Sequence, residues 1–214
     1  MDKKYLIETT KRMRVGGTGP KRHQLKFFEK LGKVPQPMVD ELNDILDAEP
    51  RNDIGGDVYG ISQAINYKQV FDTSGYRQLL VQTKPPEEVG VDVDEYRYTY
   101  WTKDVKVRKF LESYFTNVYR FRMSEMSDAH QLNWHIDSCT SYMCRAQICL
   151  NENDSVFEFR GRDGTIHSFQ MEVGDLWFIN TGWNHRVVTG KIPRRVAIFG
   201  YHFDNLKNKD LLLL

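Results

Sequence analysis

Three residues in the second half of the chain have the types and spacing of a metal site. His135 and Asp137 lie two positions apart, and His185 follows in a separate apolar segment. Residues two apart on a strand point to the same face, so this imidazole and carboxylate can bind one ion together. Two histidines and a carboxylate form the three-ligand set that suits non-haem Fe(II), with coordination positions left open. The pattern therefore predicts the metal site of an oxygenase.

An arginine is expected beside this site. Residues 183–188 and 194–199 have the composition of strands, and the segment between them contains a Gly and a Pro, which are typical of a turn. If the two strands form a hairpin centred on Gly190, His185 lies opposite Arg195, with Cβ atoms about 5 Å apart on one face. A guanidinium is always charged and its fork of donors matches a carboxylate. Arg195 is therefore predicted to bind the far carboxylate of 2-oxoglutarate chelated to the iron.

The segments that carry these residues resemble a known family, the 2-oxoglutarate- and Fe(II)-dependent dioxygenases of the aspartyl/asparaginyl β-hydroxylase type, which includes some free-proline hydroxylases. The resemblance covers roughly residues 117–204 and rests on the blocks HIDSCTSYMCRAQICL, GDLWFINTGWNHRV and RRVAIFGYHF. It implies a double-stranded β-helix, also called a jelly roll or cupin barrel. It also implies Fe(II) as the metal and 2-oxoglutarate and O2 as cosubstrates.

The resemblance implies roles for further residues. Arg145 matches an arginine that faces the cosubstrate or substrate, and Gln147 matches a polar residue two positions later. Ser124 matches a serine that assists the cosubstrate carboxylate in some members. The animal aspartyl hydroxylases lack the carboxylate ligand, whereas this chain has Asp137. In this respect the chain resembles the branch that acts on small molecules with a full triad.

The same residues indicate a class of substrate. Arg145 and Gln147 share a face of one predicted strand, which favours an inward polar role for Arg145 over a structural ion pair. A guanidinium beyond the one needed for 2-oxoglutarate suggests a substrate with its own carboxylate. We therefore expect hydroxylation of an amino acid, free or peptidyl, with decarboxylation of 2-oxoglutarate to succinate, and Asp137 favours the free amino acid.

The 214 residues, 40% of them hydrophobic, can bury one core with extensions. From residue 117 onwards, short apolar or alternating segments separated by polar turns predict a mainly β fold with flanking helices. Apolar residues recur with helical spacing within 39–46 and 107–115, which predicts two helices. We expect one domain overall, with a basic N-terminal arm (1–35), a helical and irregular covering region (36–116) and the double-stranded β-helix core (117–214).

Membrane and secretion signals are not evident in the sequence. No apolar run approaches the roughly 18 residues of a membrane span, and the N-terminal residues do not form a signal-peptide core. The cysteines Cys139, Cys144 and Cys149 are odd in number, which argues against a disulfide framework, and their spacing of five is unlike a zinc site. We therefore expect buried thiols and a cytoplasmic location.

Two other classes of function remain open. A cupin-type isomerase or metal-binding sensor would use the same barrel without 2-oxoglutarate, and the predicted anchor Arg195 argues against it. Residues 1–35 contain ten Lys/Arg and three Asp/Glu, a balance of +7 in a chain whose total is +1. Such an arm could contact nucleic acid, although a solvated tail is the favoured interpretation. A nucleic-acid adaptor would not need the intact triad.

Overall fold

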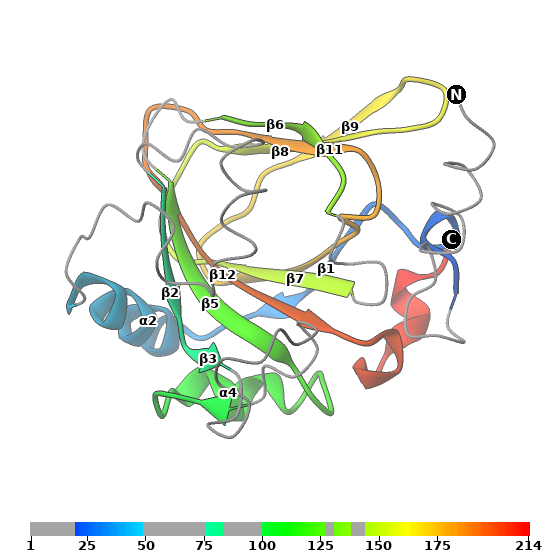
Figure 1. The fold of residues 1–214 in the computed structure, drawn as a ribbon. Helices are drawn as coiled ribbons and strands as arrows, with labels where there is room; N and C mark the ends of the chain where they lie inside the picture. Colours follow the sequence, from blue (N-terminus) through cyan, green and yellow to red (C-terminus); the bar gives the residue numbers. More distant parts are fainter. Residues whose placement is uncertain (1–19, 49–75, 84–99, 127–130, 138–143) are drawn as a thin grey trace.

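The computed structural model describes residues 20–48, 76–83, 100–126, 131–137 and 144–214 (Figure 1). Most of the predicted basic arm, much of the predicted covering region and Cys139 lie outside the described residues.

Two antiparallel sheets face each other and enclose the interior of a barrel (Figure 1). The larger sheet has the order β1 (Phe28–Lys33), β10 (Asp175–Ile179), β7 (Cys144–Cys149), β12 (Arg194–Tyr201), β5 (Tyr119–Met126), β2 (Tyr76–Leu80). The smaller sheet has the order β6 (Gln131–His135), β11 (His185–Val188), β8 (Val156–Arg160), β9 (Ile166–Phe169). A short pair is formed by β3 (Gln82–Thr83) and β4 (Tyr100–Trp101). This architecture confirms the predicted mainly β fold, a double-stranded β-helix.

The larger sheet includes strands that lie outside the segment expected to form the barrel. The apolar segments predicted as strands from residue 117 onwards coincide with β5 and with β7 to β12 of the structure. However, β1 lies within the segment expected as the arm, and β2 lies within the expected covering region. β1 pairs with β10 along the edge of the sheet, although its sequence FEKLGK has little apolar alternation. Backbone hydrogen bonds, rather than a hydrophobic pattern, identify this edge strand.

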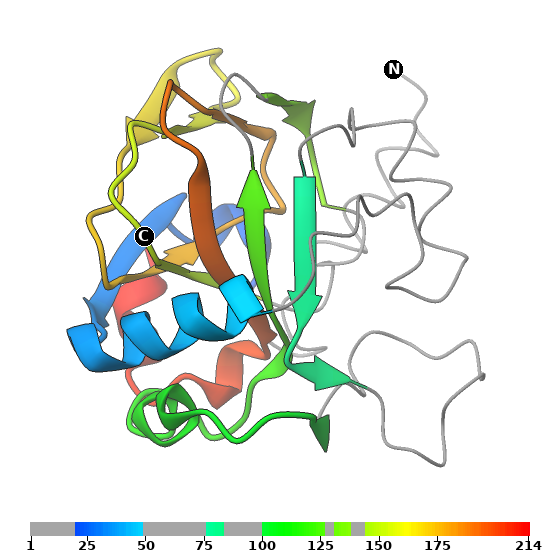
Figure 2. The same cartoon turned by 90° about the vertical axis from the view of Figure 1, so that its left-hand side faces the viewer.

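Two helices confirm those predicted from apolar spacing, α2 (Gln36–Ala48) and α4 (Lys106–Leu111). On α2 the residues Val39, Leu42 and Leu46 are fully buried, which is the spacing of one helix face. α2 lies across the outer face of the larger sheet (Figure 2), and its buried residues belong to the same apolar cluster as Met123 and Ala197 of that sheet. No helix among the described residues is long and apolar enough to cross a membrane.

Short 3-10 helices lie near both ends of the described chain: η1 (Arg22–Gln24), η5 (Phe203–Asn205) and η6 (Lys209–Leu212). The backbone N–H of Lys26 donates to the carbonyl of Leu212 at 2.9 Å, and Leu25 forms a bridge with Leu213. The segment before β1 is therefore held by the C-terminal segment.

The interior of the barrel is divided into an apolar and a polar part. A second apolar cluster includes Phe28, Phe159, Phe169 and Trp177, with the Phe28 and Phe169 rings 4.4 Å apart. Polar side chains of β5, β7 and β12 occupy the remaining interior, together with His185 of the smaller sheet. The aromatic cluster fills one part of the barrel, and the other part contains the candidate site.

The predicted hairpin across Gly190 does not form. β11 pairs with β6 and β8 in the smaller sheet, whereas β12 pairs with β5 and β7 in the larger sheet. Residues 189–193 therefore connect the two sheets instead of closing a hairpin. Strand composition predicted both strands, but composition does not specify the partner of a strand.

Candidate active site

The two predicted metal-binding histidines lie side by side on adjacent strands. His135 and His185 are paired in the register of β6 and β11, with ring centroids 4.3 Å apart. Nδ1 of His135 is 2.6 Å from the carbonyl oxygen of Asn133, and Nδ1 of His185 is 2.9 Å from that of Trp183. A carbonyl can only accept a hydrogen bond, so each Nδ1 carries the proton. Nε2 of His185 is then left with its lone pair, as in a histidine that binds a metal.

Asp137 lies beside His135, but the shared strand face that was predicted is not what places it there. β6 ends at His135, so the two residues do not share a strand face. The backbone N–H of Asp137 instead donates to the carbonyl of Thr181 at 3.0 Å, and its Oδ1 lies 3.3 Å from Nε2 of His135. The candidate ligand atoms of His135, Asp137 and His185 all lie within 4.8 Å of one another.

The electrostatics of Asp137 and His185 match the protonation states that a metal requires. Burial alone would raise the pKa of the Asp137 carboxyl, but the hydrogen bond with His135 and the charge of Arg145 hold it well below its usual range. Burial lowers the pKa of His185 to about 4. Burial also acts to lower the pKa of His135, but the hydrogen bond with Asp137 outweighs it and the pKa is raised. A carboxylate with a neutral His185 is a donor set for a divalent cation.

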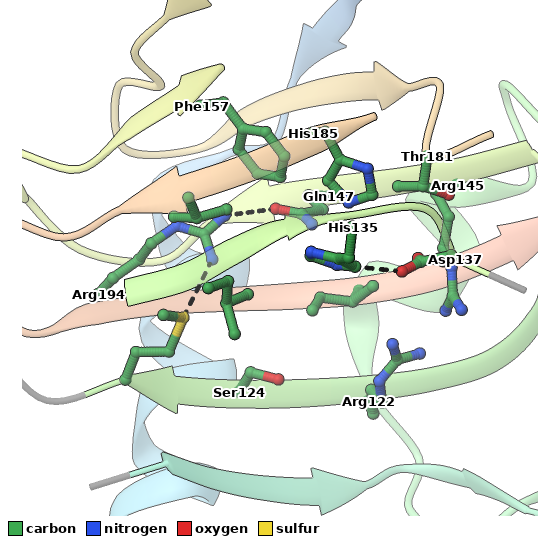
Figure 3. A pocket seen from close by; sticks show the side chains of 14 residues that line it. Arg122, Ser124, His135, Asp137, Arg145, Gln147, Phe157, Thr181, His185 and Arg194 are labelled. Carbon is green, nitrogen blue, oxygen red and sulfur yellow. Dashed lines mark hydrogen bonds and ion pairs between the residues drawn. The ribbon is translucent and has the colours of Figure 1, made fainter. Parts of the chain in front are cut away.

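The three residues open into a cavity of about 60 Å³ (Figure 3). Its floor is the inner face of the larger sheet, and its roof comes mainly from β6, β8 and β11. The lining residues are Arg122, Ser124, Met126, Leu132, His135, Asp137, Arg145, Gln147, Phe157, Thr181, His185, Val187, Arg194 and Ile198.

The prediction that Arg195 faces the metal site is corrected by the structure. Arg195 does not line the cavity; its Nε donates to Glu125 at 2.6 Å and its Nη2 to Asp47 at 2.7 Å. Asp47 belongs to α2, which covers the outer face of the larger sheet. The prediction depended on a hairpin between β11 and β12. Because that hairpin does not form, the position that faces inward is one residue away from Arg195.

Arg194 occupies the inward position instead. It is buried, donates a hydrogen bond to Oε1 of Gln147, and its guanidinium carbon lies 5.4 Å from the centre of the Phe157 ring. The sequence offers little to distinguish it from Arg195, because the following residues, Val-Ala-Ile-Phe, are apolar on both faces of the strand.

Three other predicted residues share the cavity with the candidate metal ligands. Ser124, Arg145 and Gln147 all line the cavity, and Nε of Arg145 is 3.6 Å from Oδ2 of Asp137. Arg122 and Thr181 line it as well but were not predicted. Arg122 had a detectable signal, because it is two residues before Ser124 and therefore shares its strand face.

No family model matches the sequence. No curated protein sequence matches it either. Among solved structures, the chain is similar to a prolyl-4-hydroxylase from Pseudomonas putida, with 12% identity and a TM-score of 0.55 over 82% of this chain and 92% of that one. It also matches HygX from Streptomyces hygroscopicus, solved with nickel, 2-oxoglutarate and hygromycin B, at 12% identity and a TM-score of 0.47 over 94% and 87% of the two chains. A 2OG-Fe(II) oxygenase family member from Burkholderia pseudomallei matches at 17% identity and a TM-score of 0.39, over 63% and 70%.

The prolyl-4-hydroxylase likeness shows the fold, a double-stranded β-helix. The class defined by fold and site together is a cupin-like barrel with a candidate His-Asp-His metal site in its interior.

Proposed function

We propose that the protein is an Fe(II)- and 2-oxoglutarate-dependent dioxygenase that hydroxylates an amino acid or an amino-acid side chain and converts 2-oxoglutarate to succinate and CO2. The observation that carries the proposal is that one cavity contains both the His-Asp-His group and a buried arginine, Arg194. The prolyl-4-hydroxylase with the same fold supports it by analogy.

In this proposal His135, Asp137 and His185 hold the ion. Nε2 of each histidine and the Asp137 carboxylate would supply three ligand atoms, and the other coordination positions would remain for 2-oxoglutarate and O2. Bound Fe(II), with 2-oxoglutarate and O2, would supply the oxidising chemistry, and the protein positions the reactants and excludes water. The carbonyls of Asn133 and Trp183 fix the orientation of the two rings.

Arg194 replaces Arg195 as the proposed anchor of 2-oxoglutarate. Its guanidinium matches the C5 carboxylate, and the hydrogen bond to Gln147 holds it in place. We propose that Ser124 assists it, because Ser124 lines the same cavity and lies two residues before Met126, the strand partner of Arg194.

The first prediction tests the metal and the anchor separately. Purified protein should bind one Fe(II) per chain under anaerobic conditions, and 2-oxoglutarate should then produce the charge-transfer absorption of an Fe(II)–2-oxo acid chelate. His185→Ala should lose iron binding and this absorption. Arg194→Gln should keep iron but weaken 2-oxoglutarate binding by about two orders of magnitude, because loss of one partner of a desolvated charge pair costs about 2–5 kcal/mol.

The neighbouring arginine provides a matched control. Arg195→Gln makes the same chemical change one residue away on the opposite face and should leave 2-oxoglutarate affinity unchanged. Equal affinity in wild type and Arg194→Gln would refute the anchor. Iron binding without any binding of 2-oxoglutarate would instead favour a non-redox cupin-type metal-binding protein or isomerase.

A further inference from the structure

The turn that follows β10 makes a backbone contact with two of the three candidate metal ligands. The carbonyl of Thr181 accepts the backbone N–H of Asp137 at 3.0 Å, and the carbonyl of Trp183 lies 2.9 Å from Nδ1 of His185. Figure 3 shows Thr181, Asp137 and His185 at the same end of the site. The position of this turn, residues 180–184, therefore determines where the carboxylate and the imidazole lie. We call it the ligand turn.

Asn180 begins the ligand turn and is fully buried. Its side-chain amide donates to the carbonyl of Arg22 at 2.9 Å and to that of Lys26 at 3.1 Å. Its backbone N–H donates to the carbonyl of Phe27 at 2.8 Å, and its own carbonyl accepts the N–H of Trp183 at 3.0 Å. One asparagine thus closes the turn and joins it to the segment before β1, residues 22–27.

Trp183 contacts the same segment from the other end of the ligand turn. Its indole Nε1 donates to the carbonyl of Arg22 at 3.3 Å, and its ring lies edge-on to that of Phe27 with centroids 5.0 Å apart. Between the two ends, the side chain of Arg22 lies against Gly182, where a Cβ would be 2.8 Å from its Cγ and Cδ. Residues 22–27 therefore support the turn along its length.

The supporting segment is itself fixed. Leu25 is buried in the main apolar core at 1% exposure. The backbone N–H of Leu214 donates to the carbonyl of Gln24 at 3.1 Å, next to the bond between Lys26 and the C-terminal segment. A segment anchored on both sides can hold a turn in one position, because few of its backbone groups are free to rearrange.

A shift of the ligand turn would change the shape of the metal site. Asp137 and His185 would move with it, whereas Nδ1 of His135 contacts Asn133 of its own strand, β6, and would stay. The distances between a metal and its donor atoms are defined to within about 0.2 Å, so a small displacement of two donors relative to the third weakens binding. Groups that orient metal ligands typically change metal affinity by about 10–100-fold when they are mutated.

We propose that Asn180 and Trp183 are positioning residues of the metal site, through which residues 22–27 hold the two carbonyl groups that orient Asp137 and His185. Neither is among the described residues that line the cavity, so both act through the turn and not by contact with the ion. The proposal rests on the proposed function, since it takes the His-Asp-His group as the site of a divalent metal ion.

The first test measures metal binding by full-length Asn180→Ala and Trp183→Phe without 2-oxoglutarate. Mn(II) affinity is obtained from the electron paramagnetic resonance signal of the free ion, and the absorption spectrum of bound Co(II) reports the geometry of its ligands. Asn180→Ala should weaken Mn(II) binding by about tenfold or more. Trp183→Phe keeps an aromatic ring and removes only the indole N–H, so its loss should be several-fold. Both should shift the Co(II) bands.

Each variant has a matched control away from the ligand turn. On the outer face of the larger sheet, the side-chain amide of Asn43 donates to the carbonyl of Leu150 at 2.7 Å and its oxygen accepts from an arginine at 3.4 Å. On β10, the indole N–H of Trp177 donates to the Asp175 carboxylate at 3.3 Å. Asn43→Ala and Trp177→Phe remove equivalent groups. Both should lower the unfolding temperature but leave Mn(II) affinity within about twofold of wild type, because affinity does not follow stability while the protein is folded.

The second test needs no mutation. Coupling between two regions is reciprocal, so if residues 22–27 stabilise the metal site, bound metal must stabilise residues 22–27. Saturation of the wild-type protein with Mn(II) should therefore slow amide hydrogen exchange in residues 22–27 as well as in 180–185. Exchange in α2, on the outer face of the larger sheet, should not change. This measurement and Trp183→Phe decide the question even if Asn180→Ala does not fold.

The outcomes separate the two proposals. Failure of the wild-type protein to bind Mn(II) would reject the metal site and the proposed function with it. Normal binding of Mn(II) and 2-oxoglutarate by wild type, with wild-type Mn(II) affinity in Asn180→Ala and Trp183→Phe, would overturn only the positioning role. Equal losses of affinity in the variants and their controls, or unchanged exchange in residues 22–27, would overturn it as well.

Discussion

Arg194 and Arg195 are neighbours in the sequence but lie in opposite surroundings. Arg194 is buried in the cavity and bonded to a neutral amide, Gln147. Arg195 lies on the outer face between two carboxylates, Glu125 of β5 and Asp47 of α2. Its contacts join a helix to the sheet, so its role in the structure is to hold α2 in place.

Replacement of Arg195 by alanine should therefore affect stability. We expect Arg195→Ala to lower the free energy of unfolding by about 1–2 kcal/mol, more than an isolated surface ion pair, because one guanidinium serves two carboxylates. Urea unfolding measures this, with Arg160→Ala as a control for loss of an exposed arginine. Unchanged stability combined with weaker 2-oxoglutarate binding would show that Arg195 acts in the site after all.

The residues of the candidate site differ in how far the sequence could predict them. The types and spacing of His135 and His185 indicated a site, and the structure places both rings together. Asp137 was expected to join them by strand alternation, but it does so through a backbone contact with Thr181, which no spacing rule contains. The role predicted for Arg195 depended on the pairing of β11 with β12. Because this pairing was wrong, the predicted inner and outer faces of β12 were exchanged.

At the scale of elements, strands were more predictable than their partners. Short apolar segments between polar turns gave the positions of β7, β8 and β10 because burial determines composition locally. The assignment of β11 and β12 to different sheets depends on contacts between distant segments. β1 was missed because an edge strand is held mainly by its backbone.

Two glycines in turns allow a test of close packing between elements. Both have positive φ, +81° at Gly174 and +86° at Gly164, but their surroundings differ. A Cβ at Gly174 would lie 2.7 Å from the carbonyl oxygen of Val34, whereas a Cβ at Gly164 would meet nothing within 4 Å. The backbone N–H of Val34 also donates to the carbonyl of Gly174 at 2.7 Å, which joins this turn to the end of β1.

Gly164→Ala should cost only the left-handed backbone penalty, about 1–2 kcal/mol. Gly174→Ala carries the same penalty and also displaces the Val34 carbonyl, so we expect a further loss of about 1–3 kcal/mol. Chemical unfolding of the two variants in parallel gives the difference directly. Equal losses of unfolding free energy in the two variants would mean that the Val34 carbonyl at the end of β1 can move away from the new Cβ without destabilising the protein.

At the scale of the whole molecule, β7 lies inside the larger sheet and buries two cysteines. Cys144 and Cys149 are free thiols at 0% and 1% exposure. Burial raises the pKa of Cys144 to about 12, so at pH 8 only about one thiol in ten thousand is the reactive thiolate. Burial also raises the pKa of Cys149.

Neither thiol should react with iodoacetamide in the folded protein at pH 8, and both should react once urea unfolds it. Peptide mapping by mass spectrometry measures each site separately, and the loss of protection should follow the same urea dependence as the loss of tertiary structure. Rapid labelling of Cys144 without denaturant would show that β7 opens locally.

The strand order of the larger sheet has a consequence for how the chain reaches this structure. In the order β1-β10-β7-β12-β5-β2, no two adjacent strands follow each other in the sequence, and β1 pairs with a strand more than 140 residues away. Such a topology has a high contact order, so loop-closure entropy is lost before the pairings form, and folding is slow. Because β12 lies between β5 and β7, a chain emerging from the ribosome cannot join these two strands until residues 194–201 are available. During synthesis the earlier strands therefore keep exposed edges, the condition under which nascent β-proteins aggregate or bind chaperones.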